Sequence, residues 1–275
     1  MCPFRDGSEH AVMERSCKPH TLGRPGIHRH RTVIMSAGVN EHLSKQFDAE
    51  LESIRSRVLE MGGLVESQIR RALEGFSSGD RALLDDVIAT DRRVNELEVQ
   101  LDGACSHVIV KRQPAANDLR LIFAITKTVT DLERIGDEAQ KIARMGKSIH
   151  EREGPNARLT RAADVRHAAD VVLTMLRRAL DAFARLDCNA AQEVIEQDQL
   201  IDAEFQSLLR QLVTYMMEDP RTITTSLDVI WVAKAIERMG DHAKNMAEYV
   251  IYIVKGTDVR HISSREAAAQ VGRSG

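Results

Sequence analysis

The sequence predicts an all-α protein made by tandem duplication of two three-helix bundles, with six long helices in all. Composition is the first reason. Aromatic residues make up only 4% of the chain, and Ala, Leu, Arg, Glu and Asp dominate, which favours helix over sheet. The second reason is proline, which after residue 39 occurs only at positions 114, 155 and 220 and so permits long helices. The third is an internal repeat that covers most of the chain.

Breaks that contain polar residues, glycine or proline divide the chain into six segments. They are the stretches SSGD at 77–80, RQPAAND at 112–118, REGPN at 152–156, LDCN at 186–189 and EDPR at 218–221. Between them, apolar residues recur with the period of an α-helix. The breaks predict helices at roughly 40–76, 80–111, 116–150, 158–185, 189–217 and 221–255.

Three of these helices precede REGPN and three follow it, which predicts a first repeat at 39–153 and a second at 154–256. Residues 1–38 show no amphipathic period and lack the apolar core of a signal peptide, so we expect a disordered extension there. Residues 257–275 are expected to form a flexible tail.

The two repeats align well beyond their helix pattern. Residues 70–91 match 177–198 without a gap, at an offset of 107. The octapeptide LERIGDEA at 132–139 returns as IERMGDHA at 236–243. Coincidence at this density is improbable, so each half is a copy of one ancestral three-helix unit.

The octapeptides carry the most informative carboxylates. Glu133 and Asp137 lie one residue beyond the apolar stripe of the third helix, and Glu237 and Asp241 lie equally in the sixth. Such a pair alone is usually a solvated helix face. The second helix of each half changes this interpretation, because there an aspartate falls inside the apolar stripe.

That aspartate is Asp91 in the first half and Asp198 in the second, with Asp202 one turn further on. A carboxylate among packed apolar side chains loses hydration, which is costly unless a cation or several donors replace the water. Since the second and third helices of a bundle are neighbours, Asp198 and Asp202 can face Glu237 and Asp241. Like charges this close call for a positive partner.

Two kinds of positive partner remain open. Basic side chains are available within the bundle, at Arg134, Lys141, Arg238 and Lys244. Clustered carboxylates without histidine also suit oxygen-preferring cations, that is, divalent or iron ions. Gly136 and Gly240 fit a crowded site, because glycine lowers helix propensity and must offer room in return. Asn95 stands where the second half has Asp202, so the first site is expected to be weaker.

Charge and motifs exclude several function classes. The net charge is −3, so nucleic acid is not an expected partner. No apolar run approaches the ~20 residues that span a bilayer. The four cysteines have no paired spacing, as in a reducing cytoplasm. The sequence contains no P-loop, nucleophile elbow or HExxH motif, and we expect no enzyme activity.

Several stretches together resemble the PhoU family of phosphate-transport regulators: SKQFDAELESIRSRVLEMGGLVE at 44–66, LERIGD, and IERMGDHAKNMAE. The likeness covers about residues 39–261. It implies a cytoplasmic, dimeric adaptor that reaches the membrane only through its partners. Those partners are the sensor histidine kinase of the phosphate regulon and the ATPase subunit of the phosphate ABC transporter. The adaptor restrains both when phosphate is plentiful.

The resemblance also implies metal sites, since some PhoU proteins hold iron or other metal clusters through pairs of acidic motifs. The corresponding ligands here are Asp91, Glu133 and Asp137 in one half and Asp198, Asp202, Glu237 and Asp241 in the other. A second function class is therefore a carboxylate-bridged metal bundle with iron-storage or oxidase activity. Those bundles pair Glu with a His three residues on, whereas Gly136 and Gly240 stand there.

Overall fold

The computed structural model of the chain describes residues 37–153, 162–260, 262 and 264–272, so the extension predicted for 1–38 lies almost entirely outside the described residues. The six predicted long helices are all present, and their ends agree with the prediction to within a few residues. They are α1 (Ala37–Ser78), α2 (Arg81–Arg112), α3 (Ala116–Glu153), α4 (Ala162–Arg185), α5 (Cys188–Glu218) and α6 (Ile223–Lys255), with a short 3-10 helix, Pro220–Thr222, before α6.

The second helix of each half begins at an equivalent capping aspartate. Asp80 accepts hydrogen bonds from the backbone N–H groups of Ala82 and Leu83, at 2.9 and 3.3 Å. Asp187 does the same for the two residues after Cys188, at 2.9 and 3.1 Å. Each carboxylate satisfies N–H groups that the first turn leaves without a helical partner. The aligned pair therefore starts α2 and α5 at the same place in the repeat.

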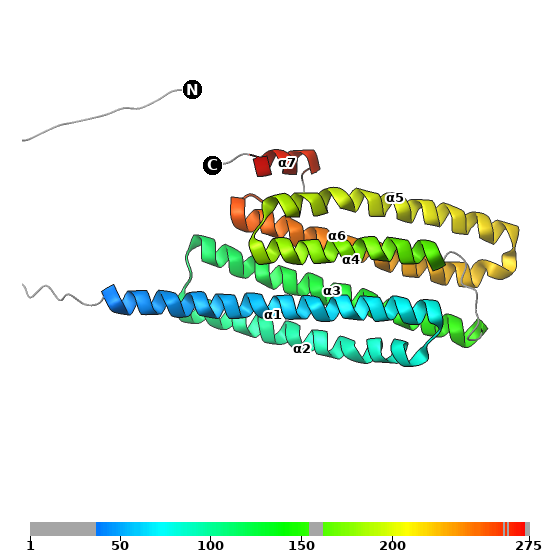
Figure 1. Ribbon diagram of the computed structural model, residues 1–275, viewed down its shortest axis with the longest axis horizontal. Coiled ribbons are helices and arrows are strands. Elements are labelled where there is room, and N and C mark those ends of the chain that lie inside the picture. The colour runs from blue at the N-terminus through cyan, green and yellow to red at the C-terminus, as the bar shows by residue number, and fades with distance from the viewer. Residues whose placement is uncertain (1–36, 154–161, 261, 263, 273–275) are drawn as a thin grey trace, which may run out of the picture.

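The six helices run along the long axis of an elongated molecule and form two three-helix bundles (Figure 1). Helices α1, α2 and α3 make one bundle and α4, α5 and α6 the other, and the bundles meet where α3 packs on α6 and α1 on α4. The predicted apolar stripes face the bundle cores. Leu121 of α3 and Phe205 of α5 are only half-buried. Along α6 the whole apolar stripe is buried, namely Val229, Val232, Ile236, Met239, Ala243, Met246 and Val250. The duplication predicted from sequence is thus a duplication of structure.

The contact between α3 and α6, called the seam below, is antiparallel. Asp131 of α3 contacts His242 of α6 at 2.8 Å, and Glu138, one heptad further along α3, contacts Arg238 at 2.9 Å. Asp131 and Glu138 are each only 2% exposed. The two buried carboxylates of the seam therefore join the halves by directional contacts in addition to apolar packing.

The C-terminal segment differs from the flexible tail expected from residue 257. The structure has a further helix there, α7 (Ser264–Gly272), which lies against α5 and α6. Val259, in the connection, and Ala267, on α7, are each 2% exposed. Two small apolar side chains thus anchor the segment. The helix itself is too short for a helical period of apolar residues to stand out in the sequence.

No helix in the described part of the chain combines the length and the apolar character that crossing a membrane requires.

Candidate functional site

Asp91 lies at the centre of a group of carboxylates between α2 and α3. It is 5% exposed, and its two oxygens accept hydrogen bonds from the amides of Gln140, at 2.9 Å, and Gln68, at 3.4 Å. Burial raises the pKa of Asp91, and the nearby Asp137 carboxylate raises it further. The prediction that Asp91 is a buried carboxylate is therefore confirmed, and neutral amides are the donors that surround it.

Glu133 is partly buried and lies close to other carboxylates of this group. Its pKa is raised to about 7, first by burial and then by the charges of Asp137, Glu98 and Asp91. Glu98 itself has a raised pKa, caused by burial and by neighbouring carboxylates. We call Asp91, Glu98, Glu133 and Asp137 the first acidic cluster. Sequence analysis missed Glu98, although its place seven residues after Asp91 puts it on the same face of α2.

Asp198 holds the equivalent position between α5 and α6 and is 2% exposed. Its Oδ2 accepts a hydrogen bond from the Lys244 ammonium at 2.7 Å. Its Oδ1 is buried and finds no hydrogen-bond partner within the described residues. Burial lowers the pKa of Lys244, but the hydrogen bond and the charge of Asp198 outweigh this effect, so the net shift is upward. Of the two kinds of counter-charge that the sequence left open, Asp198 uses a lysine.

The other predicted carboxylates of the second half gather around Asp241. Burial raises the pKa of Asp241, and the charges of Glu237, Asp198 and Asp202 raise it further. Asp202 is exposed, and Glu237 contacts the Lys234 ammonium at 2.6 Å. We call Asp198, Asp202, Glu237 and Asp241 the second acidic cluster. The structure therefore brings the predicted residues of each half within electrostatic range of one another.

The two clusters differ in their donors. At the offset of 107 between α1 and α4, Gln68 corresponds to Met175, which cannot donate to Asp198. At the offset of 104 between α3 and α6, Gln140 corresponds to Lys244. Two amides in the first half are thus replaced by one ammonium in the second. The repeat alignment contains this difference, but only the structure shows which aligned residues reach the aspartate.

Glu248 adds a further buried acid near the second cluster, which sequence analysis also missed. It is 5% exposed, and burial raises its pKa to about 7 in spite of the nearby Lys244 charge. Its counterpart in the first half is Arg144, which lowers the pKa of Asp91. The halves therefore place opposite charges at this point.

Gly136 lies where α3 comes close to α1 and α2. A Cβ added there would be 3.2 Å from Gln68 Oε1 and 3.3 Å from a methyl group of Val94. At Gly240, a Cβ would be no closer than 3.5 Å to the Ile201 side chain, which is ordinary contact. Of the two roles that the sequence suggested for these glycines, close helix approach applies at Gly136.

The metal-ligand prediction is not resolved by this geometry. Across the residues that the structure describes, no three His, Cys, Asp or Glu side chains are grouped so that they could hold a metal ion. The charges nevertheless suit a cation, because the carboxylates of each cluster raise one another's pKa values. The unpartnered Oδ1 of Asp198 is a further buried oxygen that could ligate. A metal therefore remains a prediction, and binding one would require side chains to rotate toward it.

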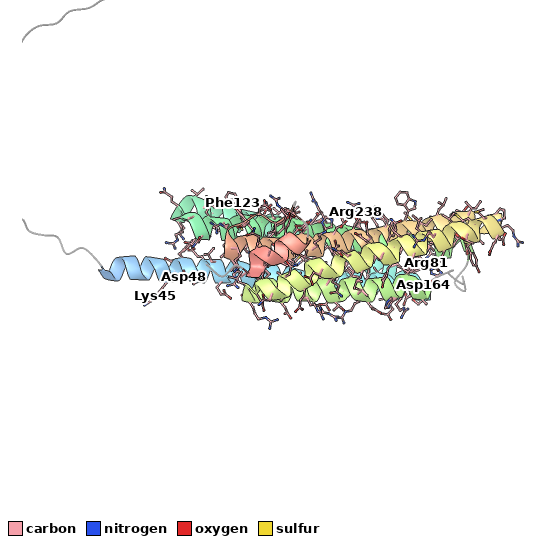
Figure 2. All side chains as sticks on the ribbon, turned by 90° about the horizontal axis from the view of Figure 1, so that it is seen from above. Lys45, Asp48, Arg81, Phe123, Asp164 and Arg238 are labelled. Atoms are coloured by element: carbon pink, nitrogen blue, oxygen red, sulfur yellow. The ribbon has the colours of Figure 1, made fainter. Side chains whose placement is uncertain are left out.

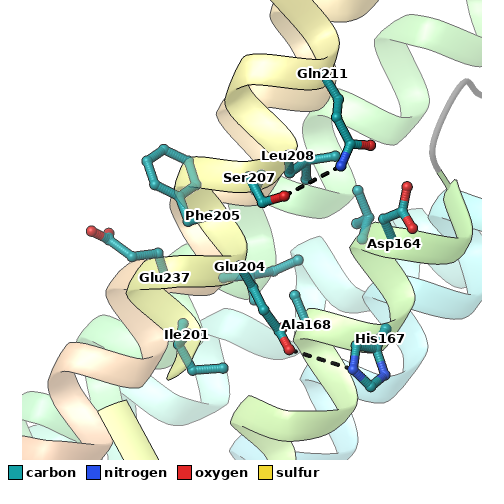
Figure 3. Close-up of a pocket in the computed structure, with 13 residues that line it drawn as sticks. Asp164, His167, Ala168, Ile201, Glu204, Phe205, Ser207, Leu208, Gln211 and Glu237 are labelled. Atoms are coloured by element: carbon teal, nitrogen blue, oxygen red, sulfur yellow. Dashed lines mark hydrogen bonds and ion pairs between the residues drawn. The ribbon is translucent and has the colours of Figure 1, made fainter. Parts of the chain in front are cut away.

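The second cluster borders a cavity of about 140 Å³ between α4, α5 and α6 (Figure 3). Ile201, Phe205 and Leu208 make its lining largely apolar. Its polar contacts are the pair His167–Glu204, at 3.4 Å, and a hydrogen bond from Gln211 to Ser207, at 3.3 Å. Figure 3 shows the Glu237 carboxylate pointing away from His167. The cavity therefore supplies neither a nucleophile with its base nor a cradle for a phosphate.

Comparison with known proteins gives a consistent result. A family model described as the PhoU domain matches twice, over residues 58–145 and 165–250. The chain is 48% identical to the phosphate-specific transport system accessory protein PhoU homolog of Pseudomonas putida, over 87% of this chain and 92% of that protein. It is 43% identical to the Escherichia coli K12 protein PhoU, with 84% and 94% covered.

Solved structures agree with these sequence matches. The crystal structure of PhoU from Pseudomonas aeruginosa is similar at a TM-score of 0.74 and 47% identity, covering 77% of this chain and all of that one. The phosphate transport system regulatory protein PhoU from Streptococcus pneumoniae is similar at a TM-score of 0.71 and 25% identity, covering 78% and 99%. Each half of the fold corresponds to one match of the family model.

Proposed function

The chain belongs to the PhoU family, and on this basis we propose that it is a non-enzymatic regulatory adaptor in phosphate homeostasis. It lowers expression of the phosphate regulon and restrains the phosphate ABC transporter when phosphate is plentiful. The observation that carries the proposal is the double match of the PhoU domain together with 43–48% identity to accessory proteins over most of both chains. A role in regulating phosphate transport is supported by those names.

The finer part of the proposal concerns partners. The adaptor acts by contact with the sensor histidine kinase of the phosphate regulon and with the ATPase subunit of the transporter. It works in the cytoplasm as a homodimer and reaches the membrane only through those proteins. What supports a contact mechanism is the fold: six long helices present extended outer faces that are suited to binding other proteins.

The test is a deletion of the gene in phosphate-rich medium. We expect a phosphate-regulon reporter and high-affinity phosphate uptake both to rise, and a plasmid copy of the gene to restore repression. Light scattering on the purified protein should give twice the 30.7 kDa mass of one chain. A reporter that stays repressed in the deletion strain would contradict the regulatory role.

We further propose that the acidic clusters bind divalent or iron ions. The ligands would be Asp91, Glu133 and Asp137 in the first half, and Asp198, Asp202, Glu237 and Asp241 in the second. Two features favour the first cluster over the second: Glu98 adds a carboxylate to it, and Lys244 competes with a cation for Asp198. Both oppose the weaker first site that Asn95 suggests from sequence alone.

Equilibrium dialysis of purified protein against Mn²⁺ or Fe²⁺, followed by elemental analysis, tests this proposal. We expect Asp91→Ala to lower bound metal more than Asp198→Ala, and Lys244→Gln to raise it. The far-UV circular dichroism of each variant should remain that of the wild type. Metal content below a tenth of an equivalent in the wild type would leave only the protein's own donors to neutralise the clusters.

The alternative function, a metal bundle with iron-storage or oxidase activity, predicts a different result. Iron loaded without oxygen should then give rapid peroxo or oxo absorbance and turnover on exposure to oxygen. A regulatory adaptor predicts neither.

A further inference from the structure

A groove on the outer side of the seam holds the only tryptophan of the chain. Trp231 of α6 forms one wall and Met145 of α3 the other, around a cavity of about 220 Å³. The Trp231 side chain is 63% exposed, so most of its ring meets solvent instead of the core. Figure 2 labels Arg238, which borders this groove, on the same long edge of the molecule as the exposed Phe123. We call this feature the seam groove.

The apolar surface continues along α6 beyond the groove. Ile223, Leu227 and Trp231 follow one another at four-residue intervals, so they form a stripe on one face of the helix. They are 41%, 46% and 63% exposed. Within the described residues no element covers this stripe. Large apolar side chains that recur on one exposed face are typical of a surface that binds another protein.

The rim of the groove is positively charged. Lys141 and Arg238 each lie 2.9 Å from Glu138, which is 2% exposed at the base of the groove. Two cations thus share one carboxylate, which leaves one positive charge over. Lys234, also on the rim, is held by Glu237 of the second acidic cluster. A chain of net charge −3 therefore presents a locally positive rim beside an exposed tryptophan.

We propose that the seam groove receives an amphipathic helix of a partner protein. One large apolar side chain of that helix sits between Trp231 and Met145, and a carboxylate beside it pairs with Lys141 and Arg238. Tryptophan and arginine are the residues that most often dominate the binding energy of protein interfaces. A helix laid in a groove is also a common way in which such surfaces are used.

The size of the charge argues for a protein partner. Anionic membranes and nucleic acids are bound by clusters of several uncompensated lysines and arginines, on the order of 4–8 for a lipid surface. One surplus charge is too few for either, but it matches one carboxylate on a helix. The identity of the partner rests on the proposed function, which names two candidates, the sensor kinase and the transporter ATPase subunit.

Because Trp231 is the only tryptophan, its fluorescence reports directly on the groove. The experiment titrates the full chain with the purified cytoplasmic part of the kinase or with the purified ATPase subunit. Tryptophans of the partner are replaced, or the emission of the partner alone is subtracted. We expect the Trp231 emission to shift to shorter wavelength on binding, as the ring leaves water.

The affinity of two variants and two matched controls for the partner is measured by a label-free method such as calorimetry. Trp231→Ala is expected to weaken binding by at least ~10-fold, and Arg238→Gln by a smaller factor. Leu200→Ala removes an apolar side chain of similar exposure, 60%, from α5, and Arg92→Gln removes an exposed arginine of α2 that is paired with Glu96. Both controls should bind as the wild type does.

The possible contradictions are distinct. If the wild type binds a partner and Trp231→Ala binds it equally well, the groove proposal is wrong and the regulatory adaptor stands. If the wild type binds neither partner, the partner contacts of the proposed function fail, and the groove proposal fails with them. If Trp231→Ala instead converts a dimer to a monomer by light scattering, the groove joins two copies of the chain, and the proposal is again wrong.

Discussion

Asp91 and Asp198 occupy equivalent positions, but the protein stabilises their carboxylates with different donors. Asp91 is held by two amides, and Asp198 by the Lys244 ammonium with one oxygen left without a donor among the described residues. An amide can be lost and leave a second donor in place, whereas the ammonium is the one counter-charge that touches Asp198 in the described part of the chain. The two sites should therefore respond differently when a donor is removed.

Lys244→Ala is expected to lower the free energy of unfolding by about 3 kcal/mol, because it leaves a buried carboxylate without its cation. Gln140→Ala should cost only about 1 kcal/mol, because Gln68 still donates to Asp91. Urea unfolding followed by circular dichroism at pH 8 measures both. Equal losses would show that the amides and the ammonium are equivalent in this fold.

Glu248 makes stability depend on pH in a known direction. Its pKa is about 7 in the folded protein against 4.5 for the free side chain, so between these values the folded state holds a proton that the unfolded state has released. Stability contributed by this proton is present below pH 4.5 and is lost as pH rises through 7. Glu248→Gln cannot titrate and should avoid this loss.

We expect Glu248→Gln to change the free energy of unfolding little at pH 5 and to raise it by about 1–2 kcal/mol at pH 8, relative to the wild type. Urea midpoints at the two pH values give the comparison. Glu218→Gln, at an exposed position near the end of α5, serves as the control and should show no such difference. A constant offset between wild type and Glu248→Gln at both pH values would contradict the shifted pKa.

The helices themselves were the most predictable part of the molecule. Their breaks contain capping aspartates such as Asp80 and Asp187, and their apolar stripes follow the helical period, so local physics sets where they begin and which face is buried. The repeat then predicts that the halves have one architecture. These signals lie within single segments or between aligned ones, and sequence alone is sufficient to detect them.

The contacts between elements were much less predictable. The sequence marks Asp91 and Asp198 as misplaced carboxylates, but it does not show that Glu98 joins the first cluster or that Lys141 and Arg238 bind Glu138 instead of an octapeptide aspartate. The sequence likewise does not show that His242 contacts Asp131 across the seam. Which side chains meet depends on how two faces are set against each other, and no local period encodes this.

The helices also differ in how closely they approach at the paired glycines. Gly240→Ala should raise the free energy of unfolding by about 0.5–1 kcal/mol, because alanine favours helix and its methyl group would make ordinary contacts. Gly136→Ala should lose that gain, because its methyl group would crowd Gln68 and Val94 at 3.2 and 3.3 Å. Thermal and urea unfolding of the two variants provide the test. Identical effects would mean that α3 can shift to make room for the methyl group without loss of stability.

At the scale of the whole molecule, the buried seam should make the two halves unfold together. The buried carboxylates of Asp131 and Glu138 lie inside it and contact His242 and Arg238, so separating the halves would leave polar groups and apolar surface without partners. The C-terminal segment is a separate addition, anchored by Val259 and Ala267. Its removal is therefore a clean test of how much one peripheral element contributes.

Truncation after Gly256 is expected to lower the melting temperature by several degrees, since ~1 kcal/mol corresponds to about 2–4 °C in a chain of this size. Val259→Ala in the full chain should reproduce part of the loss, because it removes buried methyl groups. Differential scanning calorimetry measures both and should show one transition. An unchanged melting temperature would mean that the segment is only loosely attached.

The antiparallel seam has a geometric consequence for the two octapeptides. Glu138 and Arg238 belong to the two octapeptides, so Glu133 and Asp241 lie at about the same height along the molecule, one toward α2 and the other toward α5. Since these two positions start at about the same height, any sliding of one half past the other would carry them apart along the axis. Spin labels at both sites would therefore give the register of the halves as a single distance, in the free protein and with a partner bound.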